Sequence, residues 1–256
     1  MTGRLRMTIS RQFAFATLAA PLALGLAACS GEAETELEER GPIDAIEAPE
    51  GTNWLETVEV TDYDGYLLGN PDAPVKVVEY ASLTCPACAQ FSANGASQLK
   101  EQYVSTGVVS FELRNQVQNA FDLTLAALVR CSAPESFHPL ADQVWSNLPQ
   151  FSSQFGAAQQ AIVANNVPED QIYVAAAQET GMLDFFSARG ISRDQARACL
   201  SDVESVRAIG DRSDEQSEEL QVTGTPTFFV NGARVDGIRW ADLEPVLQTA
   251  GARPAM

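Results

Sequence analysis

The sequence predicts an α/β fold in which a helical block separates two strand-containing regions. Residues 75–81 (Val-Lys-Val-Val-Glu-Tyr-Ala) are mostly apolar and β-branched, which is typical of a buried strand. Residues 227–230 form a second such run, and the Asn231-Gly232 pair after them favours a hairpin turn. The roughly one hundred residues between these regions carry almost no strand pattern. We therefore expect strands on both sides of a helical middle.

The chain begins with a segment typical of export. Its first twelve residues contain three arginines and no acid, and residues 13–28 are an apolar stretch too short to span a membrane. The stretch ends in Leu26-Ala27-Ala28-Cys29, which resembles a bacterial lipobox, a signal whose cysteine is lipidated and becomes the first mature residue. We predict a lipoprotein-type signal peptide over residues 1–28 and lipidation of Cys29. Ordinary cleavage that needs no cysteine is the alternative.

An acidic stretch follows the predicted signal. Residues 30–74 contain 13 acidic residues against one arginine, with few aromatic side chains. Such a composition does not support a core, so residues 29–66 are expected to form a solvated, flexible tether. The whole chain carries a formal net charge of −18. This acidity argues against nucleic acid or an anionic membrane surface as a partner.

Two cysteines stand two residues apart shortly after the first predicted strand. In Cys85-Pro86-Ala87-Cys88, Pro86 suits the first position of a helix, because its missing N–H needs no partner there. Cys85 then lies at a helix N-terminus, where the helix dipole and free N–H groups favour the thiolate. Cys88 follows about one turn later and can close a small disulfide ring. The spacing predicts a redox centre, with a zinc half-site and a purely structural disulfide as alternatives.

The other cysteines bear on metal binding and on a second disulfide. Zinc requires four ligands, but Cys29, Cys131 and Cys199 are isolated and His138 is the only histidine, so no metal site is expected. An exported chain meets oxidising conditions, in which cysteines usually pair. If Cys29 carries lipid, four cysteines remain, an even number that lets Cys131 pair with Cys199. Two buried free thiols are the alternative for these two positions.

The middle of the chain has the composition and the start signals of helices. Pro168, with two acids behind it, favours a helix start. Ser192 is a good cap for a helix over residues 193–200, and Asp202 for a long helix that ends near Leu220. Helical composition also covers residues 121–129, 140–148, 157–163 and 172–177.

A Gly-Thr-Pro turn precedes the late strand. Pro226 at this place is by default an ordinary trans proline. Combined with a CxxC motif at the first strand–helix junction, however, the Thr225-Pro226 pair makes the sequence similar to the DsbA-like family of periplasmic thiol–disulfide oxidoreductases, over about residues 67–247. The resemblance implies a thioredoxin fold, with a central mixed sheet flanked by helices and an inserted all-helical domain. The implied parts are a first thioredoxin segment (67–118), the helical insertion (119–209) and a second thioredoxin segment (210–256).

The resemblance also implies roles for particular residues. Cys85 matches the exposed nucleophile and Cys88 the buried resolving cysteine. Thr225 and Pro226 match a cis-proline loop that faces the two sulfurs and pairs with an extended substrate segment. Glu79 matches a buried acid beneath the disulfide, where a raised pKa would let it relay a proton to or from Cys88. A solvent-facing strand position is the alternative for Glu79.

Three further positions qualify this picture. Arg114 ends a predicted strand over residues 108–113 and is either a partner of Glu79 or a surface charge. His138, directly before a proline, is expected to be a helix cap or a surface residue, since thiol exchange needs no histidine. Ala87 stands where the strongest oxidants of the family carry a histidine, so the disulfide is expected to be less oxidising than theirs.

The expected function is that of a periplasmic thiol–disulfide oxidoreductase, most simply a dithiol oxidase, anchored to a membrane by its N-terminal lipid. The alternatives are a reductase or isomerase that uses the same site, because Thr225 is frequent in such relatives, or a chaperone or binding module whose CxxC is a structural staple. The expected partners are exported proteins with cysteines and a membrane redox partner. No cofactor is expected, and the protein is expected to be a monomer.

Overall fold

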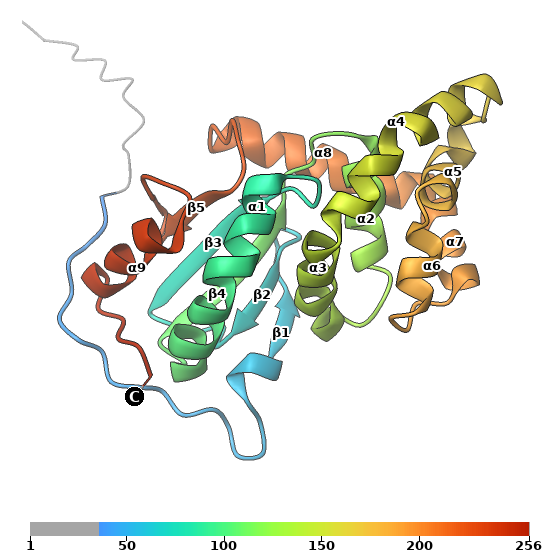
Figure 1. Ribbon diagram of the computed structural model, residues 1–256. Helices are drawn as coiled ribbons and strands as arrows, with labels where there is room; N and C mark the ends of the chain where they lie inside the picture. The colour runs from blue at the N-terminus through green and yellow to red at the C-terminus, as the bar shows by residue number, and fades with distance from the viewer. Residues whose placement is uncertain (1–35, 256) are drawn as a thin grey trace, which may run out of the picture. The chain divides into compact units, whose positions relative to one another are not determined.

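The computed structural model describes residues 36–255, so the predicted signal peptide and Cys29 lie outside the described residues. Its centre is a mixed sheet with the strand order β1-β2-β4-β3-β5-β6 (Figure 1). Strand β3 pairs in parallel with β4, and the other neighbouring strands are antiparallel. The strands are β1 (Val58–Val60), β2 (Tyr66–Gly69), β3 (Val75–Ala81), β4 (Val109–Asn115), β5 (Thr227–Val230) and β6 (Ala233–Arg234). The two strand predictions at residues 75–81 and 227–230 are confirmed.

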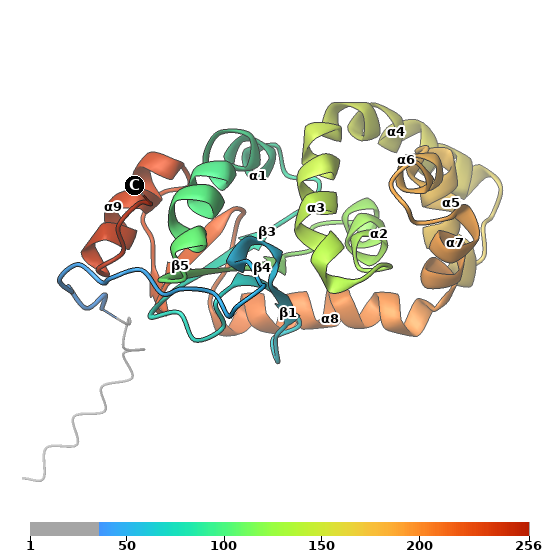
Figure 2. The same cartoon turned by 90° about the horizontal axis from the view of Figure 1, so that it is seen from below.

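Helices cover the sheet and form a separate block between β4 and β5. Helix α1 continues through π-helical turns up to Tyr103, and Figure 2 shows α1 and α9 on one side of the sheet and α8 on the other. The block confirms the predicted helical insertion. The helices are α1 (Pro86–Phe91), α2 (Ala120–Val129), α3 (Phe137–Ser146), α4 (Leu148–Ala164), α5 (Ile172–Glu179), α6 (Met182–Ser187), α7 (Arg193–Ser201), α8 (Val203–Glu219) and α9 (Trp240–Thr249). Within residues 36–255, no helix is long and apolar enough to cross a bilayer.

Local signals explain where the late helices begin. The Ser192 side chain accepts a hydrogen bond from the Gln195 N–H, and the Asp202 carboxylate accepts one from the Ser205 N–H. Both predicted caps are therefore confirmed, since each satisfies an N–H that the first turn of a helix leaves free. Helix α8 runs across the expected boundary at residues 209/210 and continues the helical block towards β5.

The two faces of the sheet carry different cores. Successive residues of a strand point to opposite faces. Val75 and Val77 of β3 are fully buried in the main core, beneath α1. Tyr80 instead packs with Val222 and Phe229 in a small second cluster. The redox centre and the main core thus share one face, and a thinner apolar layer covers the other.

The predicted flexible tether is wrong over most of its length. Between Leu37 and the start of β2 the chain follows the folded domain, and the backbone N–H groups of Arg40 and Ile43 donate to the carbonyls of Thr249 and Gly251. Trp54 is buried, and its indole N–H donates to the carbonyl of Ile46 at 2.8 Å. The acidic composition concealed isolated apolar side chains at intervals along the segment. Each of these side chains packs against a different part of the domain, so they form no periodic pattern from which their burial could be predicted.

Candidate redox site

The Cys85-Pro86-Ala87-Cys88 motif lies at the junction between β3 and α1. Cys85 is the N-cap of α1, with extended backbone angles, and Pro86 takes the first helical position as predicted. The backbone N–H of Cys85 donates to the carbonyl of Ser82 at 3.2 Å, which closes the turn between strand and helix. Both thiols are free, and Cys88 is completely buried, whereas Cys85 keeps 8% of its surface. Cys85 is therefore less exposed than the resemblance implied, but of the two cysteines it is the one that keeps some exposed surface.

The environment separates the acidities of the two thiols. A hydrogen bond from the Cys88 side chain lowers the pKa of Cys85 to about 5, and the Thr225 side chain and the N–H groups of Cys88 and Ala87 act in the same direction against burial. Burial raises the pKa of Cys88, and its hydrogen bond to Cys85 raises it further. At neutral pH the pair therefore holds one thiolate, on Cys85, and one thiol, on Cys88.

The loop before β5 closes the site from the other side. The Thr225–Pro226 peptide bond is cis, in agreement with the loop that the resemblance implies. In its protonated form, the Cys85 thiol donates a hydrogen bond to the carbonyl oxygen of Thr225, with 3.3 Å between Sγ and that oxygen. Pro226 is buried. The structure thus brings Thr225 and Pro226 to the redox motif, although more than a hundred residues separate them in the chain.

Glu79 is buried beneath this site, and the solvent-facing alternative is excluded. It lies in the middle of the sheet, opposite Leu113 of β4 and Phe228 of β5, with 1% of its surface exposed. Among the described residues, its Oε1 atom has no hydrogen-bond partner. Burial raises the pKa of Glu79 to about 8, against the opposing charge of Lys100. Glu79 is therefore mostly a neutral carboxylic acid at pH 7, close enough to Cys88 to influence the pKa of that thiol.

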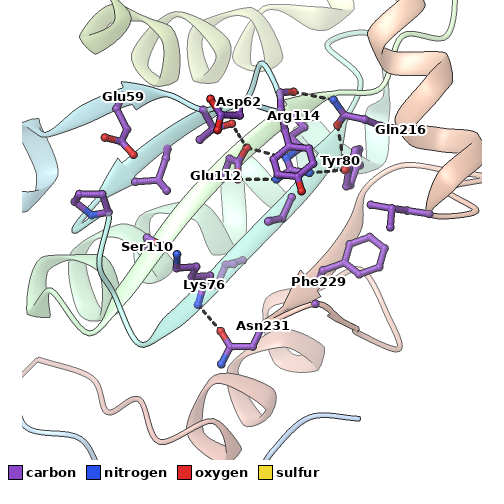
Figure 3. A pocket seen from close by; sticks show the side chains of 18 of the residues that line it. Glu59, Asp62, Lys76, Tyr80, Ser110, Glu112, Arg114, Gln216, Phe229 and Asn231 are labelled. Atoms are coloured by element: carbon purple, nitrogen blue, oxygen red, sulfur yellow. Dashed lines mark hydrogen bonds and ion pairs between the residues drawn. The ribbon is translucent and has the colours of Figure 1, made fainter. Parts of the chain in front are cut away.

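Arg114 does not pair with Glu79, and it is not a surface charge either. The parallel register places Arg114 opposite Tyr80, one residue after Glu79, and thus on the other face of the sheet. Its guanidinium is buried and holds both carboxylate oxygens of Glu112, at 2.7 and 2.9 Å. It also donates to the Tyr80 hydroxyl at 2.8 Å (Figure 3). Both alternatives for this residue were wrong because the sequence did not reveal the register.

That far face carries a hollow of about 580 Å³. Strands β3 and β4 form its floor, the β1–β2 turn one wall and the end of α8 another (Figure 3). The side chains around it include Lys76, Tyr63, Phe229 and Asn231. Neither cysteine of the motif lines it, so this hollow is separate from the redox site.

Asp122 is a site residue that sequence reasoning missed. It is buried in the first turn of α2, and its Oδ1 and Oδ2 atoms accept hydrogen bonds from the backbone N–H groups of Leu83 (2.8 Å) and Gln118 (2.9 Å). Burial raises the pKa of Asp122 to about 6. Asp122 thus holds the loop that precedes Cys85. An acid three residues after the Asn119 cap of an otherwise apolar helix was the available signal.

His138 is buried rather than exposed, contrary to the prediction. Its ring packs against Phe111 and Phe137, and Nε2 lies 2.9 Å from the carbonyl oxygen of Tyr66. Burial lowers the pKa of His138 to about 3, so the ring is neutral and Nε2 donates to this carbonyl. A single histidine on the apolar side of a helix has no periodic signal of its own. In the described residues, no cluster of three or more potential metal ligands exists.

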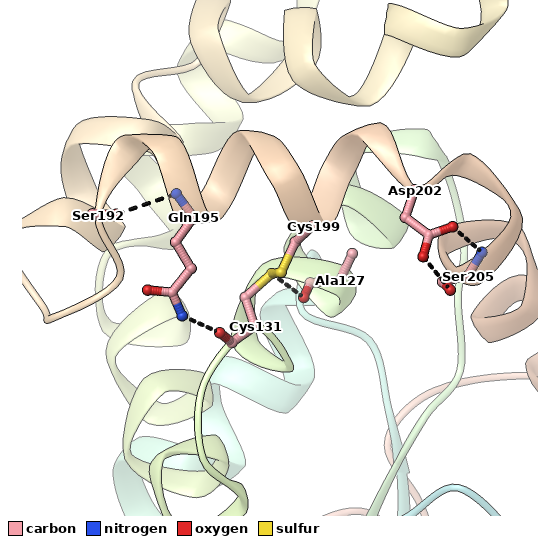
Figure 4. The surroundings of a disulfide bond; sticks show 7 residues. All are labelled: Ala127, Cys131, Ser192, Gln195, Cys199, Asp202 and Ser205. Carbon is pink, nitrogen blue, oxygen red and sulfur yellow. Dashed lines mark hydrogen bonds between the residues drawn. A yellow bond between two sulfur atoms is a disulfide. The ribbon is translucent and has the colours of Figure 1, made fainter.

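Cys131 and Cys199 form a disulfide, which confirms the predicted pairing over two free thiols. The bond joins Cys131, two residues after the end of α2, to α7, with 6.1 Å between the Cα atoms and 68 residues of sequence separation (Figure 4). The Gln195 side chain donates to the carbonyl of Cys131 beside it. The disulfide therefore ties together two helices of the inserted block.

Comparison with known proteins agrees with this geometry. Residues 61–249 match the family model described as Thioredoxin. The crystal structure of a protein-disulfide isomerase from Novosphingobium aromaticivorans is 31% identical, with a TM-score of 0.66, over 71% of this chain and 94% of that one. Alpha-DsbA1 of Wolbachia pipientis is 21% identical and shares the fold, with a TM-score of 0.59, over 73% of this chain and 92% of its own.

Curated sequences extend the comparison. Disulfide bond formation protein D of Bacillus subtilis is 23% identical over 72% of this chain and 74% of its own length. Five Rickettsia proteins whose names contain "protein-disulfide oxidoreductase" are 26–27% identical, and the chain spans 56–64% of their length. The family match covers well over half of the chain, and the fold, the CxxC helix and the cis-proline loop agree with it. The chain therefore belongs to the thioredoxin family.

Proposed function

We propose that this protein exchanges disulfides with exported proteins through Cys85 and Cys88, and that it acts chiefly as a dithiol oxidase. The observation that carries the proposal is the asymmetry of the two sulfurs. Cys85 keeps some exposed surface, and its low pKa makes it a stable thiolate, while Cys88 is fully buried and protonated. A stable thiolate favours the reduced form of the pair and hence makes the disulfide oxidising.

The exchange follows from this arrangement in two balanced steps. In the oxidised protein, a substrate thiolate attacks the Cys85 sulfur, the Cys85–Cys88 bond breaks, and Cys88 leaves with the electron pair. A second substrate thiolate then attacks the substrate sulfur of the mixed disulfide, and Cys85 leaves as the thiolate. Two electrons pass from the substrate dithiol to the cysteine pair. Reoxidation requires a membrane redox partner, which we propose as the acceptor of these electrons.

Glu79 is proposed to donate a proton to Cys88 and to accept it again. A thiolate in this buried position is unfavourable, so Cys88 must take up a proton as it leaves. Glu79 is buried, mostly neutral at pH 7 and electrostatically coupled to Cys88. Its carboxylic acid can therefore supply that proton, and its carboxylate can accept it again when the pair is reoxidised.

The loop around Pro226 is proposed to receive the substrate chain. With its own carbonyl beside Cys85, Thr225 can present backbone groups to an extended segment that approaches the sulfur. The test is a Pro226→Ala variant, which should accumulate mixed disulfides with client proteins, detectable as reductant-sensitive complexes. Pro49→Ala, at an exposed position, serves as the matched control. If neither the variant nor the wild type captures clients or oxidises a reduced dithiol protein, the proposal fails.

Isomerisation is the second candidate function, because the 31% identical Novosphingobium protein is named a protein-disulfide isomerase. Both functions use thiol–disulfide exchange, but an oxidase takes two electrons from its substrate, whereas an isomerase leaves the net oxidation state of the substrate unchanged. Reactivation of scrambled ribonuclease, whose cysteines are already oxidised but wrongly paired, would favour an isomerase. Rapid oxidation of reduced ribonuclease together with a high reduction potential would favour the oxidase.

We also propose that residues 1–28 are removed on export and that Cys29 carries the lipid anchor in the cell envelope. Since the folded domain already makes backbone contacts at Arg40, the spacer between lipid and domain would be short. A Cys29→Ala variant should lose acyl labelling and leave the detergent-extracted membrane fraction. Unchanged labelling of that variant would contradict the proposed anchor.

A further inference from the structure

The segment that leads into α2 reaches across to the cis-proline loop. The side-chain amide of Gln118 donates a hydrogen bond to the Thr225 hydroxyl, with 2.8 Å between Nε2 and Oγ1. Gln118 and Thr225 are 107 residues apart in the chain. The Thr225 hydroxyl therefore acts as an acceptor towards the helical block.

This acceptor role decides what the Thr225 hydroxyl can do next. A hydroxyl has a single proton, and accepting from Gln118 leaves that proton free to be donated elsewhere. Cys85 is the neighbour that can receive it, since the Cys85 Sγ lies 3.3 Å from the carbonyl oxygen of the same threonine, and the Thr225 side chain lowers the pKa of Cys85. The order Gln118, Thr225, Cys85 is thus a chain of donors, and in such a chain each bond polarises and strengthens the next.

Gln118 is itself held against the redox motif. Its backbone N–H donates to Asp122, whose other carboxylate oxygen accepts from the N–H of Leu83. Beside it, the Asn119 amide donates to the Thr84 hydroxyl at 3.1 Å. Asp122 is 1% exposed, so little water competes for its bonds. The start of α2 is consequently attached to the loop before Cys85 and to the loop before β5.

We propose that Gln118 is a positioning residue of the redox centre, which acts on the Cys85 thiolate through the Thr225 hydroxyl, and that Asp122 holds it there. The inference deepens the proposed function by naming what tunes the nucleophile. It concerns a property of the reduced protein alone, so it can be tested without any client protein.

The test is a titration of the Cys85 thiolate by its ultraviolet absorbance in Gln118→Ala and Gln118→Glu. Gln118 is exposed, so both variants should fold. Gln118→Ala should raise the pKa of Cys85 by about half a unit, roughly a threefold change in the thiol–thiolate equilibrium. Gln118→Glu should raise it more, because a carboxylate accepts the Thr225 proton instead of leaving it for the sulfur, and adds negative charge nearby.

A double-mutant cycle separates action through Thr225 from a general structural effect. In a Thr225→Val background, Gln118→Ala should cause no further shift, because the intermediate hydroxyl is missing. Gln195→Ala is the matched control: another exposed glutamine of the helical block, which donates to the Cys131 carbonyl and should leave the Cys85 titration unchanged. Equal shifts in both backgrounds, or no shift in either, would overturn the proposal.

Asp122→Asn gives an independent reading. The amide keeps one acceptor oxygen but places an NH₂ group against one of the two N–H donors. Loss of the Asp122 charge by itself would lower the pKa of Cys85, so a rise of this pKa reports the lost positioning of Gln118. Asp202→Asn, which alters a helix cap of α8, controls for lost stability. A wild type without exchange activity would refute the proposed function and still leave the cycle of Gln118 and Thr225 to be decided on its own.

Discussion

The sulfur of Cys85 and the carbonyl oxygen of Thr225 are 3.3 Å apart, although the two residues are separated by 140 positions. This contact joins the N-terminus of α1 to the loop before β5, the two halves of the thioredoxin fold. It places a backbone carbonyl oxygen beside the sulfur of Cys85. Four predictions test the chemistry and the stability that this arrangement implies.

The first prediction concerns the nucleophile. Alkylation of the reduced protein across pH should modify Cys85 first, with an apparent pKa near the value of about 5 that its hydrogen bonds produce. Cys88 should be spared, because it is fully buried and its pKa is raised. Peptide mass mapping after short reaction times identifies the modified residue. Equal labelling of both cysteines, or a pKa near that of a free thiol, would refute the assigned roles.

The second prediction concerns the Thr225 hydroxyl. Valine has the same shape but no donor, so Thr225→Val should raise the pKa of Cys85 and make the disulfide less oxidising. A hydrogen bond to a charged group contributes about 1.5–3 kcal/mol, which corresponds to a potential lower by about 30–60 mV at most. Thr225→Ser keeps the hydroxyl and should stay near the wild type. Redox titration against glutathione measures all three proteins, and an unchanged potential in the valine variant contradicts the hydrogen bond.

The third prediction concerns the pH dependence of stability. Burial raises the pKa of Glu79 from 4.5 to about 8, so ionisation of Glu79 opposes folding as pH rises between these values. Glu79→Gln cannot ionise. The stability of this variant relative to the wild type should therefore increase from pH 4.5 to pH 8, by about 5 kcal/mol at most.

Urea unfolding at several pH values measures this difference. Any pH-independent cost of the buried amide cancels when the trend alone is compared. Glu59→Gln, at an exposed position of β1, is the control and should follow the wild-type profile. A difference between Glu79→Gln and the wild type that does not change with pH would show that Glu79 is ionised in the folded state.

The fourth prediction concerns the Cys131–Cys199 disulfide. It closes a loop of 68 residues, so its removal should lower the free energy of unfolding by about 4 kcal/mol through the entropy of the unfolded chain. The variant to measure is Cys131→Ala/Cys199→Ala, by urea unfolding under oxidising conditions. Cys88→Ala serves as a control, because it leaves this disulfide intact. A loss well below 1 kcal/mol would mean that the unfolded chain gains little freedom when the bond is absent.

Local sequence was sufficient wherever neighbouring residues create the chemistry. Pro86 at a first helical position, after a β-branched run, specifies that Cys85 begins a helix, and the helix terminus then favours its thiolate. The Ser192 and Asp202 caps were predictable for the same reason. The pairing of Cys131 with Cys199 could be inferred from the even number of cysteines that remains if Cys29 carries lipid, because cysteines in an oxidising compartment usually pair.

Other features depend on which distant segments meet, and the sequence alone did not determine them. In the parallel register of β3 and β4, Arg114 lies opposite Tyr80. It therefore lies on the opposite face of the sheet from Glu79, because neighbouring residues of a strand point to opposite faces. Packing buried His138 and anchored the acidic segment around Trp54. The contact of Gln118 with Thr225 exists only because α2 begins beside the cis-proline loop. The sequence by itself determined the reactive motif and its helix, since both arise from adjacent residues, whereas tertiary structure decided what surrounds the sulfurs, since those neighbours come from separate elements.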